Sequence, residues 1–231
     1  MSERRPKIAV LTFPGSNDDR DAAWALHALG ADPVPVWHRD EALPDVSGVV
    51  LPGGFSYGDY LRCGAIARFA PAMEAVGRFA ADGGPVLGIC NGFQILCEAG
   101  LLPGVLRPNR SLEFICRDVR VRVVRADTKL TARCTEGQTL SIPVKHGEGC
   151  WYADDELYRE LTDLDQIVLR YEDNPNGAVH DVAGVCNREG NVLGLMPHPE
   201  HAVDPLLGSA DGSFILASLV DAARDREAAL V

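Results

Sequence analysis

The sequence has 231 residues, 46% of them hydrophobic and 24% charged, which is the length and balance of one large globular domain. Its 22 Lys and Arg against 33 Asp and Glu leave a net charge of −11, which disfavours proteins that bind nucleic-acid backbones or anionic membranes. Seven cysteines without a Cys-x-x-Cys pair, and no segment apolar enough for a secretory signal or a membrane span, predict a cytoplasmic protein without a zinc ribbon.

In the first half of the chain, short apolar runs alternate with helical stretches. The runs Ile8–Phe13, Gly48–Leu51 and Pro85–Cys90 are apolar on both faces and too short for helices, as is typical of buried parallel strands. The helices expected to follow them are Asp18–Leu29, with Asn17 as its cap, Ala65–Ala81, and Asn91–Ala99. This order predicts an open, mostly parallel sheet with helices on both faces.

The second half of the chain is richer in strands. Val119, Val121 and Val123 alternate with arginines, which is the pattern of a half-exposed, antiparallel strand. The remaining strands and the closing helix are expected at Thr139–Val144, Gln166–Tyr171, Val182–Asn187, Asn191–Met196 and Gly212–Leu230. With no internal repeat and no linker, we predict a single α/β domain over residues 1–231, with an antiparallel β extension.

The segment Gly88-Ile-Cys90-Asn-Gly92 joins a predicted buried strand directly to a helix. It has the Gly-x-nucleophile-x-Gly pattern of a nucleophile elbow, in which the nucleophile sits on a sharp turn that tolerates only small neighbours. The N-terminus of the following helix favours a thiolate at Cys90, and the amide of Asn91 is placed to stabilise an oxyanion. A buried cysteine in a tight turn would give the same short pattern, so the nucleophile needs further support.

A base, and a group to orient it, follow near the end of the chain in Met196-Pro-His198-Pro-Glu200. His198 and Glu200 are two residues apart, so they point to the same side of an extended segment, and the flanking prolines favour that backbone. Glu200 can then hold one imidazole nitrogen while the other faces Cys90. Taken alone, His-Pro-Glu is more often a surface turn, but with the elbow present the catalytic interpretation is the better one.

A third motif, Leu51-Pro-Gly-Gly54, ends another predicted strand. Adjacent glycines at that point let backbone N–H groups face a ligand, at the edge where open α/β sheets bind. We expect Gly54 to supply a second oxyanion donor, although Pro-Gly-Gly is also an ordinary turn. The three motifs are each short, but all of them lie at the ends of predicted strands, and this favours one shared site.

In this order, Pro-Gly-Gly, Gly-x-Cys-x-Gly-x-Gln and His-Pro-Glu resemble the class I (triad) glutamine amidotransferases, which implies a flavodoxin-like fold. Longer segments narrow the resemblance to the glutaminase subunits of phosphoribosylformylglycinamidine synthase, an enzyme of purine biosynthesis. These segments are Phe13–Asn17, Pro52–Arg62, Gly88–Gln94, His146–Gly149, Asn174–Gly177 and Met196–Glu200, and the resemblance spans essentially the whole chain.

The resemblance implies a reaction and partners. Cys90 would attack the side-chain amide of glutamine, His198 and Glu200 would complete the triad, and Gln94 would help to bind the substrate. The ammonia would pass to a large synthetase subunit, accompanied by a small third subunit, which converts formylglycinamide ribonucleotide to its amidine with ATP. The chain has no Gly-x-x-x-x-Gly-Lys-[Ser/Thr] loop, so ATP and magnesium are expected on the partner, with no cofactor and no metal on this chain.

Some polar residues and cysteines outside these motifs have structural interpretations. His146 in His-Gly-Glu-Gly is expected to have a structural or interface role, and Cys97 is expected in the core. Arg107, Asn109 and Arg110 form a polar loop that either meets the substrate or a partner or is a plain turn. Three rival functions stay open: a class I amidotransferase of another pathway, a stand-alone hydrolase or redox sensor with a cysteine elbow, and a non-catalytic binding module.

Overall fold

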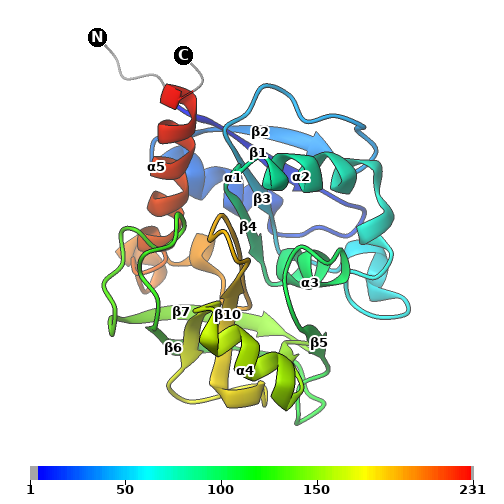
Figure 1. Ribbon diagram of the computed structural model, residues 1–231, viewed down its shortest axis with the longest axis vertical. Helices are drawn as coiled ribbons and strands as arrows, with labels where there is room; N and C mark the ends of the chain where they lie inside the picture. Colours follow the sequence, from blue (N-terminus) through cyan, green and yellow to red (C-terminus); the bar gives the residue numbers. More distant parts are fainter. Residues whose placement is uncertain (1–4, 230–231) are drawn as a thin grey trace.

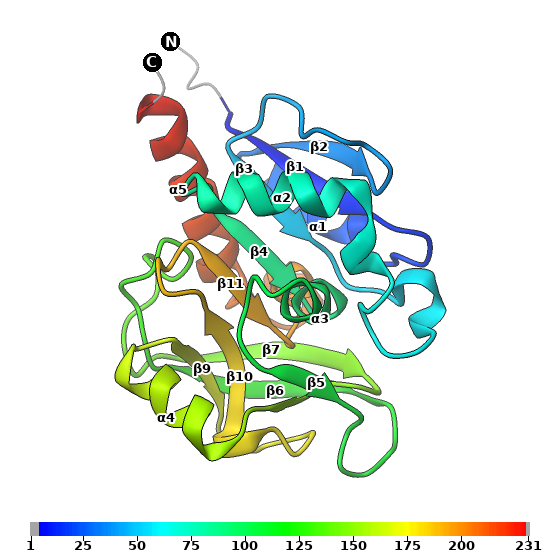
Figure 2. The same ribbon diagram turned by 45° about the vertical axis from the view of Figure 1, so that its right-hand side comes forward.

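The computed structural model describes residues 5–229. Its main feature is a nine-stranded mixed sheet in the order β2-β1-β3-β4-β11-β10-β9-β6-β7, beside a two-stranded sheet of β5 and β8 (Figure 1, Figure 2). The strands are β1 (Lys7–Thr12), β2 (Asp32–Trp37), β3 (Gly48–Leu51), β4 (Val86–Ile89), β5 (Val105–Arg107), β6 (Ile115–Val123), β7 (Thr139–His146), β8 (Cys150–Tyr152), β9 (Ile167–Tyr171), β10 (Val182–Cys186) and β11 (Val192–Leu195). The helices are α1 (Asp19–Ala28), α2 (Pro71–Ala81), α3 (Asn91–Glu98), α4 (Asp155–Asp163) and α5 (Ser213–Ala229).

The strands β2-β1-β3-β4-β11 are all parallel and follow the order of a flavodoxin-like, doubly wound sheet. Helices α1 and α5 contact each other on one face of this sheet, and α2 and α3 lie on the other face (Figure 1, Figure 2). The predicted fold class, an α/β protein with helices on both faces of an open sheet, is confirmed.

The strands β10, β9, β6 and β7 continue the same sheet as an antiparallel extension, with α4 packed beside it (Figure 2). The predicted strand Asn191–Met196, observed as β11, does not belong to this extension. It runs parallel to β4, with Val192 paired to Val86 and Leu195 paired to Ile89. The last strand of the chain therefore occupies the middle of the sheet, next to the strand that carries the elbow.

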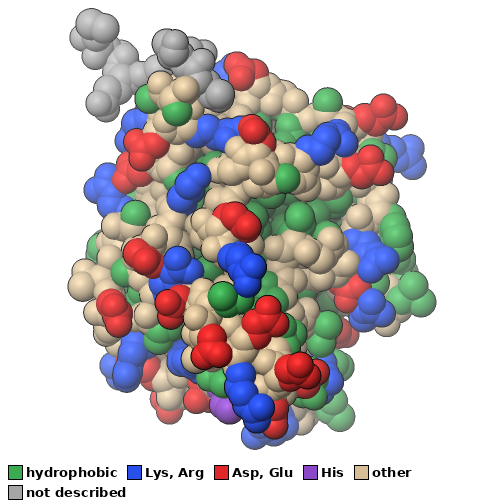
Figure 3. All heavy atoms as spheres, in the orientation of Figure 1, with side chains coloured by type: hydrophobic (Ala, Val, Ile, Leu, Met, Phe, Trp, Pro, Cys, Tyr) green, Lys and Arg blue, Asp and Glu red, His purple; other side chains and the backbone are tan. Residues whose placement is uncertain are grey.

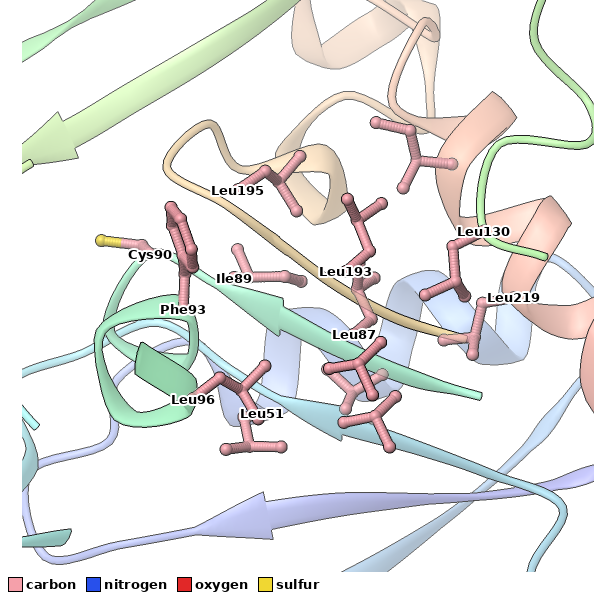
Figure 4. Packing of buried hydrophobic residues seen from close by; sticks show 14 of the residues in the cluster. Leu51, Leu87, Ile89, Cys90, Phe93, Leu96, Leu130, Leu193, Leu195 and Leu219 are labelled. Atoms are coloured by element: carbon pink, nitrogen blue, oxygen red, sulfur yellow. The ribbon is translucent and has the colours of Figure 1, made fainter. Parts of the chain in front are cut away.

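A buried part of the core lies where β4 and β11 meet α3, and every residue of both strands is buried. Leu87 and Leu193 lie on the strands, and Phe93 and Leu96 of α3 pack against them, all four without solvent exposure (Figure 4). Burying a large apolar side chain of this kind contributes roughly 1.5–3 kcal/mol. The sulfur of Cys90 points away from this cluster, so the core holds the backbone of the elbow rigid while the thiol stays free of it (Figure 4).

Two expected helices differ in detail from the prediction. The stretch Ala65–Ala81 is not one helix: a 3₁₀ turn at Ala67–Phe69 precedes α2, which begins at Pro71 because proline has no N–H to donate within a helix. In α1, the residue at the N-cap position is Asp18 and not Asn17. The expected end of the last helix at Leu230 lies outside the described residues.

Four elements, β2, β5, β8 and α4, were not predicted. The strand β2 carries two prolines that obscure the pattern of a strand, and it lies at the edge of the sheet, where proline is tolerated. Strands β5 and β8 are three residues long, too short to show a period. Helix α4 is short and mostly polar, with Leu161 as its one buried residue, so it shows little of an apolar helical pattern.

Among residues 5–229, none of the helices combines the length and the apolar character that crossing a bilayer demands. Acidic and basic side chains are intermixed on the face shown in Figure 3. The net charge of −11 is therefore not concentrated in a single patch on that face.

Candidate active site

Four loops meet at the carboxyl edge of the parallel strands. Strand β1 leads to Asp18, β3 leads to Gly53 and Gly54, β4 leads to Cys90, and β11 leads to His198. The carboxyl ends of parallel strands lie at one edge, where open α/β sheets bind their ligands. A methyl group built on Gly53 would touch both Asp18 and His198, while Gly54 and Cys90 line one cavity. The structure therefore brings together the three motifs that the sequence placed at strand ends.

Cys90 lies on a strained turn of the kind that a nucleophile elbow requires. Its backbone has φ of 49° and ψ of −103°, a conformation that residues other than glycine rarely adopt. The flanking glycines leave room for this turn. A Cβ on Gly88 would lie 2.5 Å from Leu96 Cδ1, and a Cβ on Gly92 would lie 2.0 Å from the carbonyl oxygen of Leu51. The glycines of the motif are thus required by the close approach of β3 and α3.

Replacing Gly92 by Ala is expected to destabilise the protein by about 3 kcal/mol or more, because the new methyl group would overlap a backbone oxygen that cannot move aside. Gly77→Ala in α2 is the matched control: its Cβ would meet nothing within 4 Å, and a helical Ala is favoured over Gly by about 1 kcal/mol. Urea unfolding of both variants measures the difference. Equal midpoints for the two variants would contradict the steric account.

His198 and Glu200 form a hydrogen-bonded pair that is buried completely. The Nδ1 atom of the His198 ring lies 2.6 Å from Oε1 of Glu200. The backbone N–H of His198 donates to the carbonyl of Pro143 in β7 at 2.8 Å. Burial alone lowers the pKa of His198, but the charges of Glu200 and Cys90, and the hydrogen bond to Glu200, raise that pKa above its usual value. The other ring nitrogen, Nε2, has no hydrogen-bond partner among the described residues, so it is available to Cys90.

Two backbone N–H groups lie beside the nucleophile. Asn91 is the first residue of α3, and Gly54 has a φ of +146°, which favours glycine. Within the described part of the chain, neither N–H donates to a backbone carbonyl. Both N–H groups are therefore free to donate to a ligand, and their use as the oxyanion donors stays a prediction.

Gln94 lines the cavity, as the resemblance implied, but its side-chain amide is engaged within the protein. Its Oε1 accepts a hydrogen bond from Asn91 Nδ2 at 2.8 Å, and its Nε2 donates to the carbonyl of Glu148 at 2.5 Å. Gln94 is thereby linked to the loop that closes the opposite side of the cavity. A direct contact with the substrate stays a prediction for this residue.

The cavity over Cys90 has a volume of 140 Å³ and carries charged groups that sequence analysis missed. Asp59 and Glu148 contribute carboxylates, and Lys145 contributes an ammonium group. Burial raises the pKa of Asp59, and the charge of Glu148 raises it further. Two neighbouring carboxylates favour a cationic group, such as the ammonium group of an amino acid. Both acids lie inside the segments that carried the family resemblance, so that resemblance was the available signal.

Two buried asparagines brace the loop that follows β7. Asn109 donates to the carbonyl of His146 at 2.8 Å and accepts from the N–H of Gly149 at 3.0 Å. Asn176 lies 3.1 Å from Nε2 of His146 and donates to the carbonyl of Gly149 at 2.8 Å. Burial and the positive charge of nearby His198 lower the pKa of His146 to about 3, so its imidazole is neutral. His146 thus belongs to a buried hydrogen-bond network at the cavity wall.

Sequence analysis also missed a cluster next to the candidate triad. Asp18, His201, His198 and Glu200 place one potential ligand atom each within 4.8 Å of one another. Asp18 and His201 come from opposite ends of the chain. Only the fold brings them together, and their immediate sequence neighbours gave no signal beyond that of a helix start and a turn.

Cys97, which was expected in the core, is half-buried, and its thiol donates to the carbonyl of Pro103.

Comparison with known proteins agrees with this geometry. Residues 5–212 match the family model of the CobB/CobQ-like glutamine amidotransferase domain. The phosphoribosylformylglycinamidine synthase subunit PurQ of Rubrobacter xylanophilus is 57% identical over 94% of this chain and 99% of the relative. The same subunit of Salinibacter ruber is 53% identical over 93% of this chain and 96% of the relative.

A solved structure with a similar fold is described as the structure of PurLQS from Thermotoga maritima. The matching chain is 43% identical, with a TM-score of 0.87, and the match covers 94% of this chain and 99% of that one. With a family model and relatives that span nearly all of the sequence, the chain belongs to the glutamine amidotransferase family and, within it, to the PurQ subunits of phosphoribosylformylglycinamidine synthase.

Proposed function

We infer that this chain hydrolyses glutamine to glutamate and ammonia as the glutaminase subunit of phosphoribosylformylglycinamidine synthase. The ammonia passes to a synthetase that uses ATP to convert formylglycinamide ribonucleotide to formylglycinamidine ribonucleotide in purine biosynthesis. The observation that carries this proposal is the buried Cys90, His198 and Glu200 arrangement at the carboxyl edge of the sheet, in a chain of this family.

The Cys90 thiolate attacks the side-chain amide carbon of glutamine and forms a carbon–sulfur bond, and the carbonyl electrons move onto oxygen. The N–H groups of Gly54 and Asn91 donate to this oxyanion, a type of contact worth about 3 kcal/mol per donor in other enzymes. As the oxyanion collapses, the carbon–nitrogen bond breaks, and protonated His198 gives its proton to the departing nitrogen, which leaves as ammonia.

The γ-glutamyl thioester is then hydrolysed by water. His198, now neutral, accepts a proton from the attacking water, and the carbon–sulfur bond breaks to release glutamate and restore the thiolate–imidazolium pair. Glu200 holds Nδ1 of His198 throughout, so that Nε2 is the nitrogen that exchanges the proton with the reacting atoms. The strained backbone of Cys90 keeps the sulfur in place at the cavity through both steps.

We place ATP and magnesium on the synthetase partner and no cofactor or metal on this chain. The partners of the chain are a large synthetase subunit and a small third subunit, in keeping with the PurLQS complex from Thermotoga maritima. The absence of a phosphate-binding loop motif in the sequence supports the placement of ATP on the synthetase partner. The soluble substrates of the reaction support a cytoplasmic location.

The nearest rival is an amidotransferase of the same chemistry that serves another synthetase, and reconstitution distinguishes the two. Alone, the chain should release glutamate from glutamine slowly. Adding the synthetase and small subunits of phosphoribosylformylglycinamidine synthase, with formylglycinamide ribonucleotide and ATP, should raise the rate strongly, measured as glutamate formed. Stimulation by the synthetase of a different pathway, and not by this one, would contradict the proposal.

A further inference from the structure

We propose that Asp18 is a positioning residue for His198, a second carboxylate that works with Glu200 to orient the imidazole and to stabilise its protonated form. The proposal rests on the glutaminase function given above and concerns a residue outside the Cys90, His198 and Glu200 triad.

Asp18 approaches the imidazole of His198 at its Nδ1 atom. Its Oδ2 lies 3.7 Å from Nδ1 of His198, the same nitrogen that lies 2.6 Å from Glu200. Its Oδ1 accepts a hydrogen bond from Lys145 Nζ at 2.5 Å and lies 3.4 Å from Nε2 of His201. The proton on Nδ1 of His198 is therefore held by Glu200, and Asp18 places a second negative charge near the same nitrogen.

The Asp18 carboxylate faces the candidate site and does not cap its own helix. Asp18 is the N-cap residue of α1, yet its side chain accepts no capping hydrogen bond, although an aspartate cap usually stabilises a helix. The N–H groups of Asn17 and Asp18 both donate to the carbonyl of Gly53 at 3.2 Å. A Cβ on Gly53 would lie 2.4 Å from Oδ2 of Asp18 and 2.6 Å from Cε1 of His198, so this glycine lets the two groups pack against the same stretch of backbone.

Asp18 stays charged although only 3% of it is exposed. Burial raises the pKa of Asp18, but the hydrogen bond from His201 and the charges of His198 and Lys145 hold that pKa below its usual range. A charged carboxylate at this distance stabilises imidazolium relative to imidazole. The other titratable groups that face His198 are Glu200, Cys90, His201 and His146, and His146 is neutral.

The side chains of Asp18, His198, Glu200 and His201 are also of types that bind metals. In this cluster, however, Nδ1 of His198 is hydrogen-bonded to Glu200, and Oδ1 of Asp18 is paired with Lys145. Ligand atoms of His198, Glu200 and Asp18 are thus already engaged, and Lys145 supplies a cation beside them. The arrangement therefore favours a charge network that acts on His198.

The test compares Asp18→Asn, Lys145→Met and, as a matched control, Asp21→Asn, which removes an exposed acid in the first turn of the same helix. Two properties of the reconstituted complex are measured from neutral to strongly alkaline pH, because, despite burial, the neighbouring charges of Glu200 and Cys90 raise the pKa of His198 to about 10. The first is the kcat and KM of glutamine hydrolysis. The second is the rate at which iodoacetamide alkylates Cys90, followed by mass spectrometry of its peptide, which requires no substrate and reports the thiolate–imidazolium pair directly.

Asp18→Asn should lower kcat about tenfold with little change in KM, slow Cys90 alkylation at neutral pH about tenfold, and move the alkaline limb of activity to lower pH. Lys145→Met removes the ammonium group that offsets the charge of Asp18, so the alkaline limb should move to higher pH. Asp21→Asn should match the unmodified complex.

The proposal is overturned if Asp18→Asn matches Asp21→Asn in both measurements, or if the Asp18 and Lys145 variants shift the limb in the same direction. Activity that is lost with a chelator and restored by zinc would assign the cluster to a metal instead. Failure of the unmodified complex to use glutamine would contradict the proposed function, and the alkylation rates would still decide the role of Asp18.

Discussion

In the reconstituted complex, Cys90→Ala should abolish glutamine-dependent formation of formylglycinamidine ribonucleotide and leave ammonia-dependent formation unchanged. The variant removes the sulfur that forms the thioester, whereas external ammonia enters the reaction after that step. The alanine should be accepted by the fold, because the thiol points out of the core and the turn is imposed by the glycines on either side (Figure 4). Product formed with glutamine and with an ammonium salt, compared at equal enzyme, measures the effect.

Cys116→Ala is the control for this experiment, since Cys116 is an exposed cysteine of the extension. It should use both nitrogen sources like the unmodified complex. A Cys90→Ala complex that still used glutamine would show that the nucleophile is misassigned. A complex that lost both activities would show that the variant had broken subunit assembly.

Glu200→Gln should lower kcat for glutamine hydrolysis roughly 10³-fold or more, by analogy with the loss of the orienting carboxylate in serine protease triads. The Glu200 charge is one of the contributions that raise the pKa of His198, so the neutral amide should lower that pKa. The imidazolium would then lose its proton at a lower pH, and the thiolate–imidazolium pair would persist over a narrower range. The pH dependence of kcat should show the alkaline limb moved toward acid.

Glu136→Gln changes an exposed acid that lies far from Glu200 in the sequence. It serves as the control and should leave kcat unaltered. Ammonia-dependent synthesis should survive in the Glu200→Gln complex, because only the glutaminase step needs the triad. A Glu200→Gln variant with a kcat within about threefold of the unmodified complex would remove Glu200 from the mechanism.

Those parts of the site that depend on a few consecutive residues could be predicted from the sequence. The elbow around Cys90 and the His198–Glu200 spacing each need only a few consecutive residues, so their geometry could be read directly. Asp18 could not be recognised, because its partners Lys145 and His201 lie far along the chain and its neighbours suggest only a helix cap. The fold shows the same division. Buried strands such as Gly48–Leu51 were predicted within a residue, whereas the parallel pairing of β11 with β4 depends on contacts across half the chain.

The central position of β11 has a consequence for how the protein becomes active. Strand β4 brings the thiol, but its second neighbour in the sheet is β11, which is synthesised long after β4. The same strand delivers the imidazole, since His198 follows Leu195 by three residues. Parallel pairing over so long a sequence separation is a slow step of folding. The nascent chain thus gains its reactive pair only when the sheet is complete, and an unfinished or truncated chain carries a cysteine without its base.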